Sequence, residues 1–251
     1  MHNFNTDSKV VLITGAGKRV GATIARHCHR QGMRVAIHYR RSATEAETLA
    51  QELNQQQHDT AITLQAELQN TAAYPDLVKK VIEQWGKLDV LINNASSFYP
   101  TPFGEITEKS WDDLLGSNLK APLFLSQAAL PYLKKQKGCI INLVDIQAQR
   151  PLRKYPVYCV AKAGLVMLTK CLAKELGPSV RVNGVAPGIA LWPDDETEFN
   201  PALREKIVGR TALKRAGTPD DIADAVTFLI QHANYITGQI IAVDGGLSLD
   251  Y

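Results

Sequence analysis

Short apolar runs alternate along the chain with longer segments in which apolar residues recur at helical spacing. Strands that are apolar at nearly every position are typical of a parallel sheet that helices cover on both faces. The alternation therefore predicts an α/β fold: a single doubly wound Rossmann-type domain over residues 1–251. The expected strands are residues 9–14, 34–39, 61–67, 88–95, 138–145, 180–187 and 238–246, and three of the expected helices are 20–31, 43–56 and 71–85.

Composition and charge narrow the class of protein. The 251 residues are 45% hydrophobic and 21% charged, and the net charge of +3 does not demand a polyanionic partner such as nucleic acid. No stretch approaches the ~18 apolar residues of a membrane span, and "MHNFNTDSK" lacks the apolar core of a signal peptide. The four cysteines show no C-x-x-C spacing, so we expect a reduced, cytoplasmic protein without a metal site.

A glycine-containing turn follows the first expected strand in "VVLITGAGKRVGATIARH". Gly15 would permit the tight turn, and Gly21 would let the next helix pack closely on the strand. A helix that starts near Arg19 and Val20 presents free amide groups and a positive dipole end to a pyrophosphate. Arg19 stands where many dinucleotide loops carry glycine, and its guanidinium could clamp a phosphate. The position of the turn favours a dinucleotide site over an ordinary glycine turn.

The end of the second expected strand indicates which dinucleotide binds. An NAD site usually places an acidic residue there, which holds the ribose 2′-hydroxyl. This chain instead has Arg40, Arg41 and Ser42, preceded by His38 and Tyr39. Two guanidinium groups and a hydroxyl suit a 2′-phosphate, which a carboxylate would repel. The pattern predicts NADPH as the cofactor; the alternative interpretation is a solvated basic turn.

Tyr158 and Lys162 are four residues apart in "VYCVAK" and would share one face of a helix. A nearby lysine favours the ionised phenol, which makes the tyrosine a better proton donor near neutral pH. Lys154 also lies four residues from Tyr158, but Pro156 favours the first turn of a helix and disfavours helical geometry at Tyr155. The pair is therefore either catalytic or a solvated helix face with an aromatic anchor.

Other polar residues follow the expected strands, where ligands bind in doubly wound sheets. Asn94 and Ser96 lie in "LINNASSFYPTP", with Phe98 next to them, and Asp145 ends another strand. Asn118 lies inside an expected helix, a poor position for asparagine unless its side chain bonds something. Singly, each has an ordinary explanation as a turn, core or capping residue.

Taken together, these features resemble the short-chain dehydrogenase/reductase family over essentially the whole chain. The resemblance is carried, in order, by "TGAGKRVG", "NNAS", Asn118, "YCVAK", "NGVAPG" and "YITGQIIAVDGG". It implies that Tyr158 is the general acid, that Lys162 binds the nicotinamide ribose and lowers the pKa of the phenol, and that Asn118 holds a water in the proton relay. The implied cofactor-binding residues are Gly15, Lys18, Arg19, Val20, His38, Tyr39, Arg40, Arg41, Ser42, Glu67, Asn94, Ala95, Ser96, Lys162, Pro187 and Gly188.

Departures from the family pattern point to one branch. Most members have serine thirteen positions before the tyrosine, where this chain has Asp145, and the usual "NNAG" is "NNAS" here. With "HYRRSA" and "NNASSFYPTP", the chain looks like the pteridine reductase branch. The resemblance implies that Phe98 stacks a pterin against the nicotinamide, while Ser96, Asp145 and Tyr158 bond the polar edge of the pterin. Arg19 would reach both a cofactor phosphate and the pterin.

The chemistry of a pterin agrees with this substitution, because reduction of a ring C=N needs hydride on carbon and a proton on nitrogen. An ionised Asp145 would raise the pKa of the phenol and oppose Lys162, whereas a protonated Asp145 could donate or relay a proton. A flat substrate also gains about 0.5–1.5 kcal/mol from a stacking face. We therefore predict an NADPH-dependent enzyme that reduces dihydropterin or dihydrofolate, with oxidised pterins as further candidates.

Two other functions stay open on the sequence alone. A carbonyl reductase, for instance on 3-oxoacyl thioesters, would use the same Tyr158 and Lys162, although Asp145 and Phe98 argue against it. A module that senses NADPH without turnover belongs to a different class, and the complete Tyr158, Lys162 and Asn118 set argues against that.

Some expectations concern the surroundings of the site. Glu67 stands where the family commonly has an aspartate near the adenine, and Gln147 replaces an apolar residue expected of the branch. Residues 189–210 are expected to form a substrate lid. The resemblance also implies a homotetramer that packs through helices on the sheet faces and through the C-terminal region.

Overall fold

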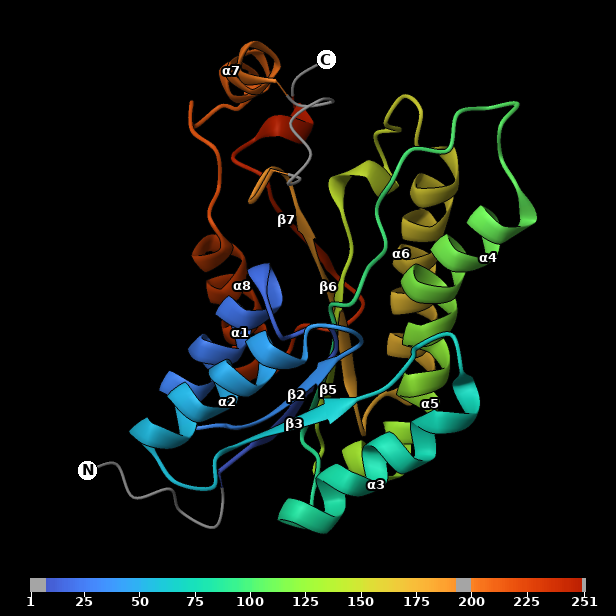
Figure 1. Ribbon diagram of the computed structural model, residues 1–251. Helices are drawn as coiled ribbons and strands as arrows, with labels where there is room; N and C mark the ends of the chain where they lie inside the picture. Colours follow the sequence, from blue (N-terminus) through green and yellow to red (C-terminus); the bar gives the residue numbers. More distant parts are fainter. Residues whose placement is uncertain (1–7, 193–199, 250–251) are drawn as a thin grey trace.

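The computed structural model describes residues 8–192 and 200–249 of the chain (Figure 1). Its strands are β1 (Val10–Ile13), β2 (Arg34–Tyr39), β3 (Ala61–Gln65), β4 (Val90–Asn93), β5 (Cys139–Leu143), β6 (Arg181–Pro187) and β7 (Ile240–Val243). All pair in parallel in one sheet of order β3-β2-β1-β4-β5-β6-β7. The order reverses between β1 and β4, and the crevice beyond such a reversal is where doubly wound sheets bind ligands.

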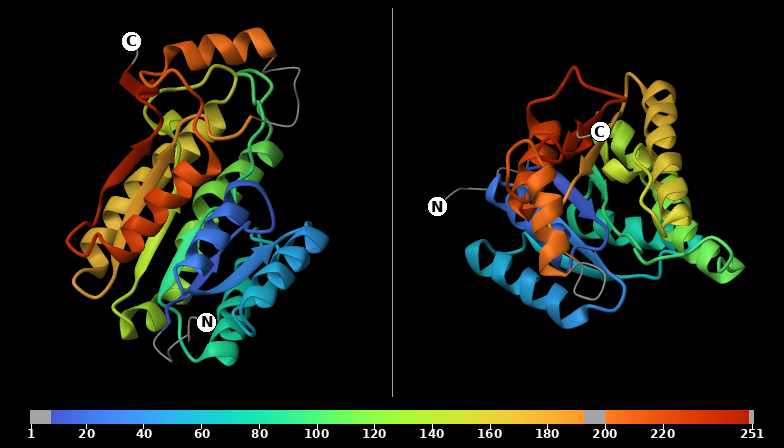
Figure 2. Two further views of the ribbon diagram at one scale, coloured as in Figure 1. Left: turned by 90° about the vertical axis from the view of Figure 1, so that its left-hand side faces the viewer. Right: turned by 90° about the horizontal axis from the view of Figure 1, so that it is seen from above.

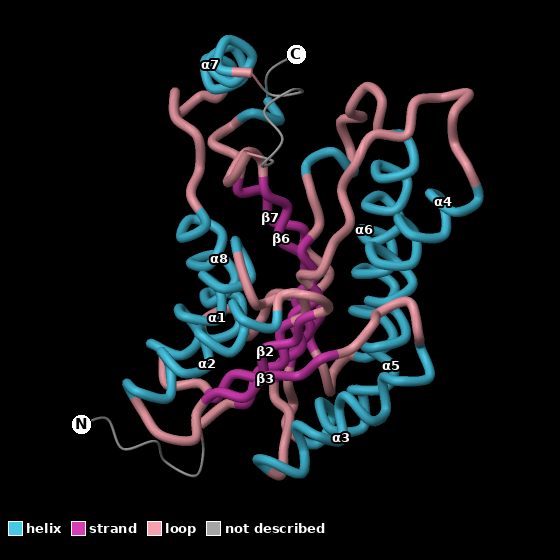
Figure 3. Tube along the Cα trace, in the orientation of Figure 1, coloured by secondary structure: helices cyan, strands magenta, loops and turns pink. Residues whose placement is uncertain are grey.

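Helices cover both faces of this sheet, as Figures 2 and 3 show. They are α1 (Arg19–Arg30), α2 (Ala43–Gln56), α3 (Tyr74–Trp85), α4 (Glu108–Leu115), α5 (Ala121–Lys135), α6 (Pro156–Leu176), α7 (Pro201–Arg210) and α8 (Pro219–Gln231). On one face, α1, α2 and α8 pack with Val11 and Ile13 of β1. On the other, α3, α5 and α6 pack with Val10 and Leu12. The strand is apolar at every position because its alternating side chains enter both cores.

The predicted Rossmann-type fold is confirmed, with small shifts at the ends of elements. α2 has the expected bounds, and α1 begins and ends one residue before the expected 20–31. The expected helix 71–85 opens with a 3-10 turn, Thr71–Ala73, before α3 begins. The predicted strands 88–95 and 138–145 are longer than β4 and β5, because their last residues leave the ladder and form site loops.

Asn118 lies in a π-helical turn, Gly116–Lys120, that joins α4 to α5. The expected position inside a helix is confirmed, but the helix is not regular there. Single π turns inside helices are frequent at functional sites. The Asn118 side chain is buried.

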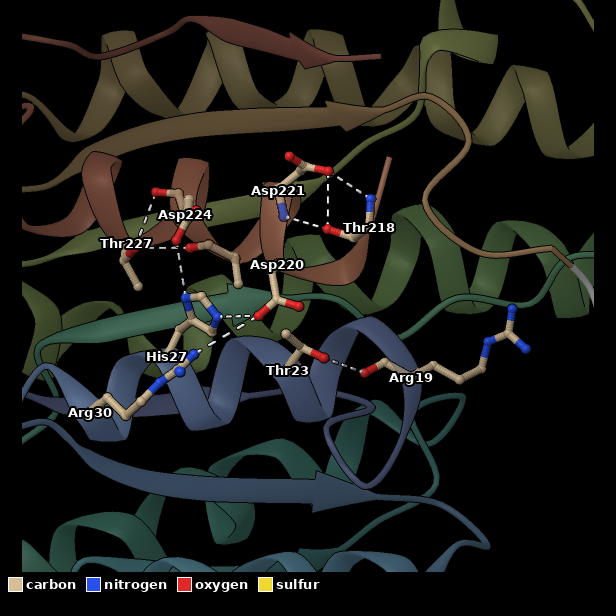
Figure 4. A network of polar contacts seen from close by, with 10 residues as sticks. Arg19, Thr23, His27, Arg30, Thr218, Asp220, Asp221, Asp224 and Thr227 are labelled. Atoms are coloured by element: carbon tan, nitrogen blue, oxygen red, sulfur yellow. Dashed lines mark hydrogen bonds and ion pairs between the residues drawn. The ribbon is translucent and has the colours of Figure 1, made fainter. Parts of the chain in front are cut away.

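Polar contacts fix α1, which follows the phosphate-loop turn, to α8 (Figure 4). His27 Nε2 lies 2.7 Å from Asp220 Oδ1, and Nδ1 lies 3.2 Å from Asp224 Oδ1. Thr218 caps α8: its Oγ1 accepts from the Asp221 N–H at 3.3 Å, and Asp221 Oδ2 accepts from the Thr218 N–H at 2.7 Å. These contacts join the first helix of the fold to the last.

α6 is the one described helix that is long and apolar enough to cross a membrane, with mean hydropathy 1.4 over its most apolar window. The sequence analysis expected no such stretch. Half of that window is buried inside the protein, and the core helix of a soluble protein passes the same test. The four cysteines are free thiols and three are buried, as expected for small core residues.

Candidate active site

The turn after β1 brings the chain close to the loop after β4. Gly15 has φ 63°, and a side chain there would lie 2.9 Å from the Ala95 Cα atom. A side chain at Gly21 would overlap the Gly15 carbonyl oxygen and lie 2.6 Å from Asn94 Nδ2. Gly15 therefore permits the tight turn, as predicted, and Gly21 lets α1 approach closely, although its neighbours belong to the turn and to the loop after β4 and not to the strand itself. Arg19 also has a positive φ of 56°, a conformation that favours glycine, which explains why its position commonly carries one.

Side chains from neighbouring strands brace this turn. Thr14 Oγ1 accepts from the Asn94 and Ala95 N–H groups at 2.9 and 3.0 Å, and Asn94 Nδ2 donates to the Thr14 carbonyl at 2.8 Å. His38 Nδ1 accepts from the Gly15 N–H at 3.1 Å, and Nε2 lies 3.1 Å from the Ala66 carbonyl. Burial lowers the pKa of His38 to about 4. His38 is therefore neutral and serves as a brace of the loop.

A cavity of about 490 Å³ runs from this turn past the end of β2. Arg40 is bound to Glu67, and Lys18 lies 3.8 Å from Glu45 Oε1. Arg41, by contrast, makes no hydrogen bond or ion pair with any residue that the structure describes. The two arginines, which the sequence pattern treated alike, thus have different surroundings, because Glu67 at the end of β3 occupies Arg40.

The arrangement around this cavity fits a dinucleotide. The two glycines let the backbone approach closely, the N-terminus of α1 opens onto the cavity, and Arg41 supplies an unengaged positive charge beyond the end of β2. Amide groups at a helix start and a guanidinium are the donors that phosphate oxygens take. Predicted cofactor residues that line it are Gly15, Lys18, Arg19, Val20, His38, Tyr39, Arg40, Arg41, Ser42, Glu67, Asn94, Ala95 and Ser96.

The three ionisable residues of the expected relay meet beyond β5 and on α6. Tyr158 Oη donates to Asp145 Oδ2 at 2.7 Å, and the Asp145 Oδ1 atom accepts from the Gln147 N–H at 2.8 Å. Lys162 Nζ donates to the Leu143 carbonyl at 2.9 Å and lies 5.6 Å from the centre of the Tyr158 ring. The helical spacing therefore places the Lys162 ammonium over the Tyr158 ring, while the two polar groups hydrogen-bond to different partners, Asp145 and the Leu143 carbonyl.

Pro156 begins α6, so Lys154 lies outside the helix, as the sequence analysis inferred. Lys154 has a φ of 72°, and Tyr155 is the residue before the first helical turn. The competing pairing of Lys154 with Tyr158 is thereby excluded as an i, i+4 helical contact.

Burial dominates the protonation of this cluster. It raises the pKa of Asp145, opposed by the Gln147 N–H, the Tyr158 hydroxyl and the Lys162 charge. Burial and the Asp145 charge raise the pKa of Tyr158 well above its usual value. Burial lowers the pKa of Lys162 to about 8. The direction at Tyr158 is opposite to the lowering by Lys162 that the resemblance implied, because burial is the largest cause and the Asp145 charge, which was expected to oppose Lys162, raises the pKa further.

Ser96 links this cluster to the π turn. Its Oγ donates to Asn118 Oδ1 at 2.6 Å, and Asn118 Nδ2 donates to the carbonyls of Ser97 and Leu114 at 2.9 and 3.0 Å. The Ser96 hydroxyl also acts on Tyr158, whose pKa it lowers against the larger effect of burial. Asn118 lines neither cavity, so the predicted water contact of its side chain stays a prediction.

A second cavity, of about 580 Å³, adjoins the first, and both are lined by Arg19, Val20, Asn94 and Ser96. Predicted residues that line only this second cavity are Phe98, Asp145, Tyr158, Lys162, Pro187 and Gly188. The Phe98 ring stacks on Tyr155 with centroids 4.6 Å apart and meets the Tyr158 ring edge-on at 4.8 Å. The cavity thus has an aromatic wall beside the hydrogen-bonded pair Tyr158 and Asp145.

The expected lid contributes to this cavity from both of its described parts. Arg19 Nη2 donates to the Trp192 carbonyl at 2.9 Å, and Ile207 of α7 also lines the cavity. Residues 193–199 of the expected lid lie outside the described residues. The sequence analysis missed several lining residues that come together only through the tertiary fold: Glu45, Gln69, Ser97, Ser117, Leu152 and Leu247. Thr14 was also missed, although a hydroxyl directly after an apolar strand is a visible signal.

Comparison with known proteins gives a consistent result. The family model described as "Enoyl-(Acyl carrier protein) reductase" matches residues 15–248. "Pteridine reductase 1" of Leishmania tarentolae is 39% identical, over 96% of this chain and 96% of its own length. The "3-oxoacyl-(acyl-carrier-protein) reductase" of Staphylococcus aureus is 35% identical over 96% and 98%. "Granaticin polyketide synthase putative ketoacyl reductase 2" of Streptomyces violaceoruber is 34% identical over 97% of each chain.

Proposed function

The chain belongs to the short-chain dehydrogenase/reductase family of oxidoreductases, and on that premise we propose that it is an NADPH-dependent pteridine reductase. The substrates would be dihydropterin or dihydrofolate, with oxidised pterins as further candidates. The single observation that carries the proposal is the 2.7 Å hydrogen bond from Tyr158 to Asp145 in a cavity whose wall includes Phe98. A carboxyl group at this place suits proton delivery to a ring nitrogen.

The residues that line the 490 Å³ cavity would hold NADPH, which would supply the hydride for the ring carbon. Tyr158 holds a proton at physiological pH, because its pKa is raised, and donates that proton to the ring nitrogen. Asp145 accepts the hydrogen bond of the Tyr158 hydroxyl at 2.7 Å, and burial raises its pKa; a protonated Asp145 could return a proton to the phenolate through the same contact. Lys162 keeps a positive charge beside the phenol and would bind the nicotinamide ribose, while Ser96 and Asn118 extend the network behind Tyr158.

The preference for NADPH over NADH is supported by the end of β2. Arg41 and Ser42 line the cofactor cavity there, and Arg41 has no partner among the described residues. The neighbouring Arg40 is held by Glu67, so Arg41 is the guanidinium best placed to take the 2′-phosphate.

The direct test is loss of NADPH absorbance with 7,8-dihydrobiopterin, dihydrofolate and a 3-oxoacyl thioester, measured side by side with the purified protein. We expect turnover of the pterin-type substrates and little of the thioester. Flat traces with both pterin-type substrates would overturn the proposal. NADPH binding without oxidation of any substrate would instead favour a sensing module.

A carbonyl reductase is the second candidate, because two of the relatives are named as ketoacyl reductases at 34 and 35% identity. Tyr158 and Lys162 would serve that reaction unchanged. Asp145→Ser distinguishes the two: a carbonyl reductase should keep or gain ketone reduction, whereas a pteridine reductase should lose pterin turnover.

The assembly and location follow from the resemblance and not from the site. We propose a cytoplasmic homotetramer; Trp111 of α4 and Leu123 and Phe124 of α5 are exposed apolar side chains that a subunit interface would cover. Sedimentation of the purified protein at micromolar concentration tests the tetramer directly.

A further inference from the structure

Gln147 brings a side-chain amide to a largely apolar part of the 580 Å³ cavity. It lies in the 3-10 turn Ile146–Ala148, directly after Asp145, and its own N–H donates to Asp145 Oδ1 at 2.8 Å. That bond fixes the backbone from which the Gln147 side chain leaves. The apolar residues that line the cavity with it include Leu152, Ile189, Leu191, Ile207 and Leu247.

The protein itself engages the other amide, hydroxyl, phenol and cationic side chains of this lining. Each donates a hydrogen bond to an acceptor of the protein: Arg19 to the Trp192 carbonyl, Asn94 to the Thr14 carbonyl, Ser96 to Asn118, Tyr158 to Asp145, and Lys162 to the Leu143 carbonyl. The Gln147 side-chain amide makes no hydrogen bond with any residue in the ranges 8–192 and 200–249. Its donor and acceptor are therefore available to a bound molecule.

We propose that Gln147 is a specificity-determining residue that binds a hydroxylated side chain on the pterin ring; this inference rests on the proposed function. A primary amide offers a donor and an acceptor side by side, and each hydroxyl of a short polyol can both donate and accept. An alkyl substituent would leave the Gln147 amide without a hydrogen-bond partner, and a carboxylate on the substrate would use only the N–H groups of that amide. An apolar wall without Gln147 would distinguish substituents by size alone.

The test compares 7,8-dihydrobiopterin, which carries two side-chain hydroxyls, with 6-methyl-7,8-dihydropterin, which carries none. Gln147→Met keeps the length of the side chain and removes its hydrogen bonds. We expect kcat/KM for dihydrobiopterin to fall about tenfold, mainly through KM, as for one lost hydrogen bond of ~1.4 kcal/mol. The value for the methyl compound should stay within about twofold, because that substrate has no side-chain hydroxyl to lose and the backbone bond from residue 147 to Asp145 is kept.

Gln149→Met is the matched control, since Gln149 is exposed just after the same turn and does not line the cavity. It should change neither kcat/KM value. An equal fall, or no fall, with both substrates in Gln147→Met would overturn this inference alone. If the unmodified enzyme oxidised NADPH with neither pterin, the proposed function itself would fail, and this inference with it.

Discussion

The proton that the proposed reaction consumes begins on the Tyr158 hydroxyl. Tyr158→Phe removes that proton and the contact with Asp145 but keeps the ring that packs against Phe98. We expect pterin turnover to fall by about 10²–10⁴-fold, the usual contribution of a positioned general acid. Steady-state kinetics measures this fall. NADPH affinity, measured by fluorescence titration, should be nearly unchanged; a large loss of cofactor binding would contradict the assigned role.

Arg41 and Arg40 provide a matched pair for the choice of cofactor. Arg41→Ala should weaken NADPH binding roughly tenfold or more, since a charge-assisted contact to the 2′-phosphate is lost, and should leave NADH nearly unaffected. Arg40→Ala should have the smaller effect on NADPH, because Glu67 already engages Arg40. Dissociation constants for both cofactors measure this difference. Equal weakening of NADPH and NADH binding by Arg41→Ala would contradict the proposal that Arg41 binds the 2′-phosphate.

The roles of single residues were predictable where a local spacing sets them. The i, i+4 spacing of Tyr158 and Lys162 and the glycine positions after β1 are of this kind. The pairing of Arg40 with Glu67 was not predictable, because it depends on the register that aligns Tyr39 of β2 with Gln65 of β3. The effect of Asp145 on the pKa of Tyr158 was visible in the sequence, but the larger effect of burial was not, because it depends on the whole fold.

At the level of helices, the N-terminal cap of α8 should contribute to the stability of the fold. Thr218→Ala removes the side-chain acceptor of the Asp221 N–H and should cost about 1 kcal/mol of unfolding free energy. Urea denaturation measures this loss of unfolding free energy, and Thr107→Ala, which removes the equivalent cap of α4, serves as the comparison. Pterin turnover should persist in both variants. An unchanged unfolding midpoint in Thr218→Ala would contradict the capping role.

Element types and their order could be read from the hydrophobic pattern, because strands buried on both faces are apolar throughout. The detailed structure of the site could not be predicted from that pattern. The π turn Gly116–Lys120 has no distinct sequence signal, since its residues also fit a regular helix. The lining residues Ile207 of α7 and Leu247 are distant in sequence from Asp145 and join it only in the folded chain.

The stability of the whole molecule should depend on pH through Lys162. Burial lowers its pKa from 10.5 to about 8, so between pH 8 and 10 the folded protein releases a proton that the unfolded chain retains. At this residue the unfolded state then binds more protons, so the contribution of Lys162 to the free energy of unfolding rises with pH, by up to ~1.4 kcal/mol per unit. Lys162→Met should remove this rise in denaturation curves from pH 7 to 10. A parallel pH dependence in both proteins would show that Lys162 does not contribute.

The most direct test of the central claim is pterin turnover in Asp145→Asn, with the unmodified enzyme as reference. Asparagine keeps the size of the side chain and a hydrogen-bond partner for Tyr158 but cannot supply a carboxyl proton. The account predicts that kcat/KM for dihydrobiopterin falls about 100-fold or more while NADPH affinity is retained. Undiminished dihydrobiopterin reduction by Asp145→Asn would contradict the account.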